Sequence, residues 1–521
     1  MGRILKNATN YITLHHMYLC MCIIILLAIV PSLNFVMLAQ SCISTKTFVF
    51  AFIQLAFGGY IYFRIIIYGK EYIKCSHIDF FLLLWYIYII INALLHNTPI
   101  FSNRTIELFF LGLFYCSLRQ LPLNKFKFVF VSLFIGGVIQ SIIGNLQLWG
   151  ILPTNHLYFT ITGSFFNPGP YAGYLASIIP IGFTWCLFKP SFSIKNGEQN
   201  LFLKYLGRGI CSSGFIILLA LAGTGSRSAW LSITISFIVL FVSKYSFFTK
   251  IKRLPNIKKV SLSLIILCLF IAGIIGLIAI RPSSILGRIL IWKITANIIK
   301  EHFLYGVGFD NFKAYYMNAQ ADYFKIGTRH GDSMVAGDTV YCFNDFLQYI
   351  VENGWIGISL SILILIAAFR VKNLFQKDIF LNLSKAGLAG IIVFALFSYP
   401  CQILPIKSAA FCYLAYIASV SSKYIYLIKW KKNIYMQLTC IFIGTCFIFI
   451  SATHLVRIYK VWEDWGKASR LSSIRNYKTA LKFIQNSYSY LDANGDYLTL
   501  KGKILYMSNN INEAIPVLQK D

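Results

Sequence analysis

Three stretches of the chain place residues that could hold an anion or move a proton beside the ends of apolar runs. The first is LAGTGSRSAWLS, 221–232, where Gly225 and Ser226 precede Arg227. A tight turn at Gly225, with Ser226 capping the next helix, would leave free backbone N–H groups beside a guanidinium, and such a helix end binds anions. An arginine at a span end also reaches the interface without any function, so the residues alone leave both interpretations open.

The second stretch, RPSSILGRILIWKITANIIK at 281–300, has the spacing of an amphipathic helix at a membrane interface. Arg281 and Arg288 are seven residues apart and fall on roughly one face. Trp292 lies one helical turn beyond Arg288. This pattern predicts a helix that presents cations outside the membrane.

The third stretch is VYCFNDFLQYIVENGWIG, 340–357, in which Asn344 and Asp345 stand where the chain re-enters an apolar run. Glu352 follows two turns further along. A carboxylate inside a span is costly unless it is paired or hydrated, which makes Glu352 a functional candidate. The alternative is a satisfied polar contact between two spans.

A break in the chain precedes another apolar run in GSFFNPGPYAGYLASIIP, 163–180, at Asn167 and the prolines that follow it. Backbone polar groups left free at membrane depth are tolerated only where protein or a water-filled cavity satisfies them. A plain turn at the start of a helix fits this stretch equally well.

Together, the arginines and the helix start of these stretches could bind a diphosphate, and their acidic or amide side chains could bind an acceptor hydroxyl. This combination predicts displacement at a lipid-linked sugar diphosphate, in which charge on the departing group must be stabilised. A base would take the proton of the incoming hydroxyl. The sequence shows no cluster with metal-ligand spacing, and most of the thirteen cysteines lie in apolar runs, so we expect no metal site.

The composition requires these residues to be positioned by membrane helices. Of 521 residues, 57% are hydrophobic and only 12% are charged. Soluble domains carry about 45–50% apolar and about 25% charged residues. The chain is therefore predicted to be an all-α, polytopic membrane protein, which excludes a soluble enzyme, a disordered chain and a secreted disulfide scaffold.

About thirteen apolar runs are long enough to be read as spans. They lie near 17–38, 47–68, 78–95, 104–118, 127–148, 169–188, 209–224, 227–244, 259–280, 345–369, 383–400, 404–421 and 435–453. Lys and Arg crowd the even-numbered connections, whereas 149–168 has none. This is the positive-inside pattern with a cytoplasmic N-terminus, and it explains most of the formal net charge of +29 without nucleic acid.

Four domains are predicted: an N-terminal bundle at 1–160, a core at 161–421, a last span at 422–453 and polar helices at 454–521. The core contains a long connection, 281–344, which the parity of the spans places in the periplasm. In the last segment Tyr477, Ala480 and Leu481 recur 34 residues later as Ile511, Ala514 and Ile515, which is the tetratricopeptide period. We expect this segment to be periplasmic and to bind a protein partner, although an ordinary pair of amphipathic helices is the alternative.

Four motifs in order make the chain resemble the O-antigen ligase and O-antigen polymerase superfamily of bacterial membrane glycosyltransferases. They are Gly163-x-Phe165-x-Asn167-Pro168 with Ala172–Leu175, then Thr224–Leu231, then Arg288 to Trp292 with Leu304 to Phe312, and finally Asn344 with Gly354 and Gly357. They cover about 163–357. The resemblance implies transfer of a glycan from undecaprenyl diphosphate, at the periplasmic face of the inner membrane, to lipid A core, another glycan or a protein hydroxyl, without metal or cofactor.

The resemblance also implies roles for single residues. The arginines that contact the diphosphate map onto Arg227 and Arg288, with Asn167, Ser226, Trp292 and Asn344 in supporting positions. The histidine that opens the last motif in the family falls on Phe343, which cannot take a proton. The candidates for a replacement base are Asp345, Glu352, Asp338 and His330. The departure leaves room for a polymerase-like member with a different acid and for a catalytically degenerate scaffold. A transporter or flippase of lipid-linked glycans, which would have a similar composition, is the other alternative.

Overall fold

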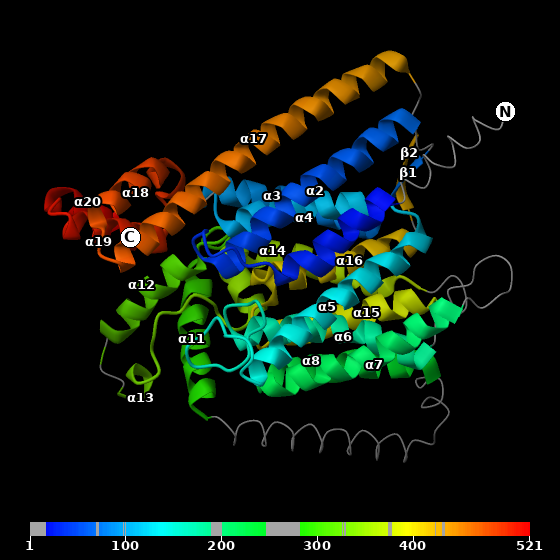
Figure 1. The fold of residues 1–521 in the computed structure, drawn as a ribbon, viewed down its shortest axis with the longest axis horizontal. Coiled ribbons are helices and arrows are strands. Elements are labelled where there is room, and N and C mark those ends of the chain that lie inside the picture. The colour runs from blue at the N-terminus through cyan, green and yellow to red at the C-terminus, as the bar shows by residue number, and fades with distance from the viewer. Residues whose placement is uncertain are drawn as a thin grey trace. The chain divides into compact units, whose positions relative to one another are not determined.

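The computed structural model describes residues 17–68, 72–96, 98, 101–188, 201–245, 282–325, 327, 330–372, 378–422, 424–429 and 433–520. The chain forms two compact units. The first comprises Met1–Phe80, Thr98–Leu175 and Gln402–Asp521, and the second comprises Phe81–Asn97 and Ala176–Cys401. Figure 1 labels their elements.

The first unit contains most of the N-terminal helices and the whole C-terminal stretch. Its elements are η1 (Ile25–Ile29), η2 (Val30–Ser32), α2 (Ser41–Tyr68), β1 (Tyr72–Ser76), α4 (Asn103–Arg119), η3 (Leu123–Lys125), α5 (Phe126–Leu148), α16 (Leu404–Val420), β2 (Tyr424–Lys429), α17 (Ile434–Ser473), α18 (Tyr477–Leu491), α19 (Gly495–Met507) and α20 (Ile511–Lys520). Two further helices, α3 (His77–Leu95) and α6 (Pro168–Phe188), begin in this unit and end in the second.

A buried polar group joins three helices of the first unit. Glu107 of α4 is 2% exposed, accepts a hydrogen bond of 2.6 Å from the Thr47 hydroxyl of α2, and forms an ion pair with Lys407 of α16. A carboxylate inside an apolar helix bundle needs such partners, because an unpaired charge there is strongly disfavoured.

Two short strands pair antiparallel, with Tyr72 opposite Lys429 and Cys75 opposite Tyr426. The strand β1 lies in the second predicted connection, and β2 lies in the twelfth. Paired strands must lie on one side of a membrane, so their pairing agrees with the alternation of sides that the cations predict.

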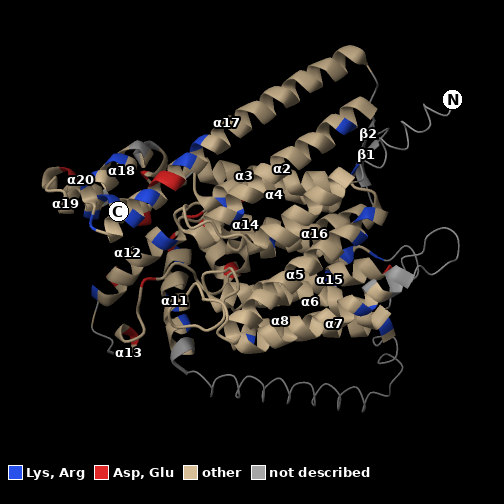
Figure 2. Cartoon of the chain, viewed as in Figure 1, with Lys and Arg blue, Asp and Glu red and all other residues tan. Residues whose placement is uncertain are grey.

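The 40-residue helix α17 runs from the last apolar run into the polar C-terminal segment without a break at residue 453. Its charged residues gather in its C-terminal half (Figure 2). Its N-terminal half exposes Phe442 and Phe449, as expected of a surface in contact with lipid. At 1.5 Å per residue the helix is about 60 Å long, roughly twice a bilayer core.

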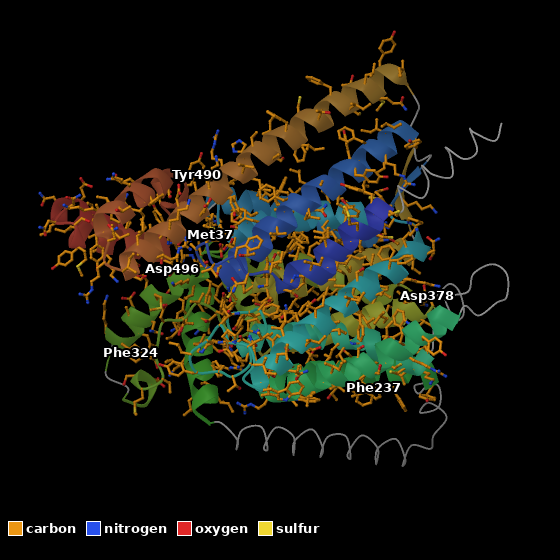
Figure 3. The ribbon with its side chains drawn as sticks, viewed as in Figure 1. Met37, Phe237, Phe324, Asp378, Tyr490 and Asp496 are labelled. Atoms are coloured by element: carbon orange, nitrogen blue, oxygen red, sulfur yellow. The ribbon has the colours of Figure 1, made fainter. Side chains whose placement is uncertain are left out.

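The C-terminal half of α17 is anchored to the connection that precedes α2. A Cβ on Gly466 would lie 2.3 Å from the Met37 carbonyl oxygen, so the two backbones are in direct contact. The Ala39 N–H donates to the Trp462 carbonyl at 3.2 Å. In the same region the Gln40 amide donates to the Asp496 carboxylate of α19 at 3.0 Å; Met37 and Asp496 are labelled in Figure 3.

The second unit contains the remaining helices of the core. Its elements are the ends of α3 and α6, then α7 (Leu201–Thr224), α8 (Arg227–Tyr245), α11 (Pro282–Glu301), α12 (Phe312–Lys325), α13 (His330–Ser333), α14 (Asp345–Arg370), α15 (Ile379–Ala395) and the start of η4 (Pro400–Gln402).

Small residues hold α8 against α15. The Ser232 hydroxyl donates to the Gly390 carbonyl at 2.7 Å, and the Ser236 hydroxyl donates to the Ala386 carbonyl at 3.0 Å. A Cβ on Gly390 would lie 2.1 Å from Ser236 Oγ, so only glycine permits this approach. Such small-residue contacts are the usual means by which membrane helices pack closely.

The apolar face of α11 forms the core of the loop region. Leu290, Ile294 and Ile298 recur every four residues and are all buried. They pack with residues of α12, α14 and the intervening loops: Val307, Phe312, Tyr316, Cys342 and Val351. The predicted amphipathic helix over 281–300 is therefore present, although Arg281 lies outside the described residues.

Within the described ranges, eight helices are long and apolar enough to cross a membrane, and three shorter apolar helices accompany them. They coincide with eleven of the thirteen predicted spans, and the prediction of an all-α polytopic membrane protein is confirmed. The predicted span at 104–118 corresponds to the 17-residue helix α4. The predicted span at 259–280 lies outside the described residues.

Candidate functional site

The turn between α7 and α8 presents Arg227 as the first residue of α8. Gly225 adopts φ +61°, a left-handed conformation that glycine accepts at little cost. The helix starts where the Trp230 N–H donates to the Ser226 carbonyl at 3.4 Å. The Ser226 hydroxyl lies 3.3 Å from the Ser228 hydroxyl, so Ser226 stands at the predicted helix start and its side chain contacts Ser228.

Arg288 of α11 is brought within electrostatic reach of Arg227. Burial lowers the pKa of the Arg288 guanidinium, and the positive charge of Arg227 lowers it further. The Arg288 Cζ atom lies 5.2 Å from the centre of the Phe343 ring, a cation–π distance. Like charges within this reach repel each other, and an anion bound beside both would relieve that repulsion.

Phe343, at the position of the family's histidine, is held in a strained conformation with φ +54°. The residue before it is fixed on both sides: the Trp292 indole N–H donates to the Cys342 carbonyl at 3.0 Å, and the Cys342 N–H donates to the Gln348 side-chain oxygen at 3.1 Å. Trp292 therefore positions the chain that carries Phe343.

Two tyrosines complete an aromatic cluster around Phe343. The Phe343 ring meets the Tyr399 ring edge-on at 5.4 Å, and Tyr399 stacks on Tyr341 at 4.3 Å. The sequence analysis missed both. Tyr399 lies at the end of an apolar run far along the chain, where no spacing relates it to Phe343, and Tyr341 carried no signal beyond its nearness to Phe343.

The carboxylates of α14 are buried and hydrogen-bonded. Asn344 caps the helix, because its side-chain oxygen accepts from the Phe346 and Leu347 N–H groups. Asp345 is 5% exposed and accepts from the Cys401 N–H at 2.6 Å. Glu352 is fully buried and accepts from the Gln348 amide at 3.1 Å.

The helix α14 is broken at Gly354, which adopts φ +61° and ψ −169°. The backbone groups that the break leaves without partners inside the helix form hydrogen bonds with the segment 303–308 instead. The Val307 and Gly308 N–H groups donate to the carbonyls of Val351 and Glu352, at 2.8 and 3.0 Å.

In the other direction, the Trp355 N–H donates to the Phe303 carbonyl at 3.0 Å and the Ile356 N–H to the Leu304 carbonyl at 3.4 Å. Backbone groups freed inside a span need such partners. The segment 303–308 and the last motif, which are separated in the sequence, are thus joined by four backbone hydrogen bonds between residues 303–308 and 351–356, called here the backbone lock.

Asn92 of α3 reinforces the break and was also missed. Its amide donates to the Glu352 carbonyl at 3.2 Å and to the Tyr305 carbonyl at 3.0 Å. One turn further along, His96 lies against the backbone of Gly308, where an added Cβ would approach it to 2.5 Å. The signal for Asn92 was a polar amide within a run of isoleucines and leucines.

The remaining predicted residues lie elsewhere. Asp338 is exposed in the loop between α13 and α14. His330 begins α13, and its side chain lies outside the described atoms. Asn167 belongs to the first unit, where its side-chain oxygen accepts from the Gly169 N–H at 3.0 Å at the start of α6, as a helix-capping residue does.

The chain break before α6 is satisfied by protein groups of the first unit. The Gln147 side-chain oxygen accepts from the Thr162 and Gly163 N–H groups, and the Gln140 side-chain oxygen accepts from the Ser164 N–H. Among the described residues, no group of three or more His, Cys, Asp or Glu side chains could hold a metal ion.

These features define a polytopic helical membrane protein with two arginines within electrostatic reach of each other and a broken, carboxylate-bearing helix. Residues 213–362 match the family model described as O-antigen ligase. The match confirms the resemblance to the O-antigen ligase and polymerase superfamily, and its range includes Arg227, Arg288 and Phe343. No curated protein matches the chain.

Proposed function

We propose that this protein transfers a glycan from undecaprenyl diphosphate to an acceptor hydroxyl at the periplasmic face of the inner membrane, as a metal-independent enzyme of the ligase or polymerase type. The observation that carries the proposal is that Arg227 and Arg288, from different helices within the matched range, lie within electrostatic reach of each other. A diphosphate is the anion that such a pair suits, since guanidinium groups bind phosphate oxygens in a bidentate manner.

The reaction needs the diphosphate to leave. The acceptor oxygen bonds to the anomeric carbon, the bond from that carbon to the diphosphate oxygen breaks, and the electron pair departs with the diphosphate. Arg227 and Arg288 would stabilise the charge that develops there. The start of α8 would add backbone N–H donors beside Arg227.

The proton of the acceptor hydroxyl needs a base other than Phe343. Asp345 is the first candidate, because the chain at 399–401 contacts both the Phe343 ring and the Asp345 carboxylate. Glu352 is further along the same helix and fully buried. Asp338 and His330 remain in the proposal as groups that the loop could supply.

The test uses the purified chain with an undecaprenyl-diphosphate-linked glycan and several acceptors: lipid A core, a free glycan and a serine-containing peptide. We expect Arg227→Ala and Arg288→Ala each to lower transfer at least tenfold, since a charged hydrogen bond contributes about 1.5–3 kcal/mol. Arg370→Ala is the matched control, because Arg370 is exposed at the far end of α14. Retention of full transfer by both variants would end the proposal.

A cellular measurement separates transfer from transport. In cells that lack the protein, an unused glycan donor should accumulate on the outer leaflet if the protein is a transferase. Accumulation on the inner leaflet would instead indicate a flippase.

A further inference from the structure

Two cysteines from consecutive helices of the second unit meet sulfur to sulfur. Cys186 lies near the end of α6 and Cys211 lies in α7, and their Sγ atoms are 2.7 Å apart. A disulfide bond is about 2.05 Å long, so bond formation would bring the two sulfurs closer by less than about 1 Å. The fold therefore places these two thiols where a bond between them needs almost no movement of the helices.

Two glycines of α7 accompany this sulfur contact on the face of the helix that meets α6. A Cβ added to Gly207 would lie 3.8 Å from the Trp185 Cδ1 atom. A Cβ added to Gly214 would lie 3.9 Å from the Ile179 Cδ1 atom. Positions 207, 211 and 214 share one face of a helix, because they are four and three residues apart. The sulfur contact is thus part of a packed helix pair in which small residues let the two helices approach closely.

The cysteine pair lies near one surface of the membrane. Arg208 and Tyr205 precede Cys211 by one and two turns, and the Arg208 Cζ atom lies 5.9 Å from the centre of the Tyr205 ring. Basic residues and tyrosine are typical of the membrane–water interface. Cys186 is exposed and Cys211 is partly exposed, so a small reagent can reach both. The proposed topology makes this surface the cytoplasmic one, where thiols are kept reduced and disulfides are transient and redox-sensing.

We infer that Cys186 and Cys211 form a reversible oxidation site, which hydrogen peroxide converts into a disulfide between α6 and α7. The more exposed sulfur, that of Cys186, attacks one peroxide oxygen: an S–O bond forms, the O–O bond breaks, and the released hydroxide takes the thiol proton as water. The Cys211 sulfur then attacks the sulfenic sulfur of Cys186. The S–S bond forms, the S–O bond breaks, and a second water leaves with the second thiol proton.

Two thiols are thus oxidised by two electrons in all, and one peroxide is reduced to two waters. A thiol reductant reverses the reaction by exchange with the disulfide. This inference stands apart from the proposed glycan transfer and does not depend on it.

The test uses the full chain, purified in detergent with a reductant that is then removed. Hydrogen peroxide is added, the remaining thiols are blocked with N-ethylmaleimide in denaturant, and the digest is analysed by mass spectrometry. We expect a linked pair of peptides that contains Cys186 and Cys211, is two hydrogen atoms lighter than the reduced peptides together, and is separated by dithiothreitol. Cys186→Ser and Cys211→Ser should each abolish it. Cys440→Ser is the matched control and should retain it, because Cys440 is a partly exposed cysteine of another helix, α17.

Two further measurements make the result decisive. The oxidised wild-type chain should unfold at a higher temperature than the reduced chain, since a cross-link restricts the unfolded state, and Cys186→Ser should show no such difference. In cells, the link should be absent before peroxide is added, appear afterwards, and disappear once the peroxide is removed.

The inference fails if both cysteines are recovered as maleimide adducts after peroxide treatment, or if each is oxidised singly to a sulfinic acid. It also fails if a non-reducing gel shows that the link joins two chains. A link already present in untreated cells would overturn it as well, since the pair would then be a permanent structural disulfide.

Discussion

At the scale of the residue, Phe343 lies where the family resemblance implies a histidine, and its own contacts can be described. The aromatic ring cannot accept a proton, but it lies under the Arg288 guanidinium and against Tyr399. It therefore supports the arginine that the donor diphosphate would contact. Motifs indicated Arg227, Arg288 and Phe343 as candidates, whereas the contact of Tyr399 with Phe343 could not be predicted because it exists only after folding.

Replacing the Phe343 ring should raise the KM for the donor more than it lowers the kcat. We expect Phe343→Leu to raise the KM for the lipid-linked donor about twofold to fivefold, because a cation–π contact contributes about 0.5–1 kcal/mol. Phe343→Tyr keeps a ring and should keep the KM. Phe324→Leu, in α12 and labelled in Figure 3, is the control for loss of an aromatic ring in the same unit. Equal KM values for the leucine and tyrosine variants would show that the ring does not support Arg288.

At the scale of the element, α14 combines a predictable feature with an unpredictable one. Its apolar run predicted a single span at 345–369, and a helix covers that range. The break at Gly354 depends on backbone partners from 303–308, and hydrophobic periodicity carries no information about such partners. The sequence motifs included Gly306, Gly308 and Gly354. Only the structure shows that all three lie where the segment 303–308 and α14 approach each other closely.

A side chain added at Gly354, inside the backbone lock, should destabilise the protein by more than its left-handed backbone conformation alone would. A Cβ on Gly354 would lie 2.1 Å from the Leu304 carbonyl oxygen, and the residue has φ +61°. Gly150 has φ +73° with no atom within 4 Å of the same added Cβ. Gly150→Ala should therefore cost about 1–2 kcal/mol from its left-handed conformation alone.

We expect Gly354→Ala to lower the thermal unfolding midpoint in detergent by more than Gly150→Ala does, and to lose glycan transfer with both arginines intact. Equal midpoints for the two variants would mean that the chain at 303–308 moves aside freely, which the four backbone hydrogen bonds argue against.

At the scale of the whole molecule, composition and charge predicted the fold class, and the described helices confirm it. The alternation of cations predicted which connections share a side, and the pairing of β1 with β2 agrees with it. Nothing in the composition could divide the chain into its two units, because α3 and α6 each pass from one unit to the other within a single apolar run.

The proposed topology can be measured with reporter fusions. A fusion at residue 433, beside β2, should report the cytoplasm, and a fusion at residue 521 should report the periplasm, because a single span separates them. Fusions at residues 70 and 433 should always agree with each other, since β1 and β2 pair. A cytoplasmic signal from residue 521 would reject the periplasmic placement of the C-terminal helices.

The continuity of α17 has a geometric consequence for the residues between the membrane and the C-terminal helices. Each residue of a helix turns it by about 100°, so inserting one residue there would rotate α18, α19 and α20 by about that angle around the helix axis. Gly466 would also lose its contact with the Met37 backbone. The number of residues in α17 is thus itself a structural parameter, because it sets the direction around the helix axis in which α18, α19 and α20 lie.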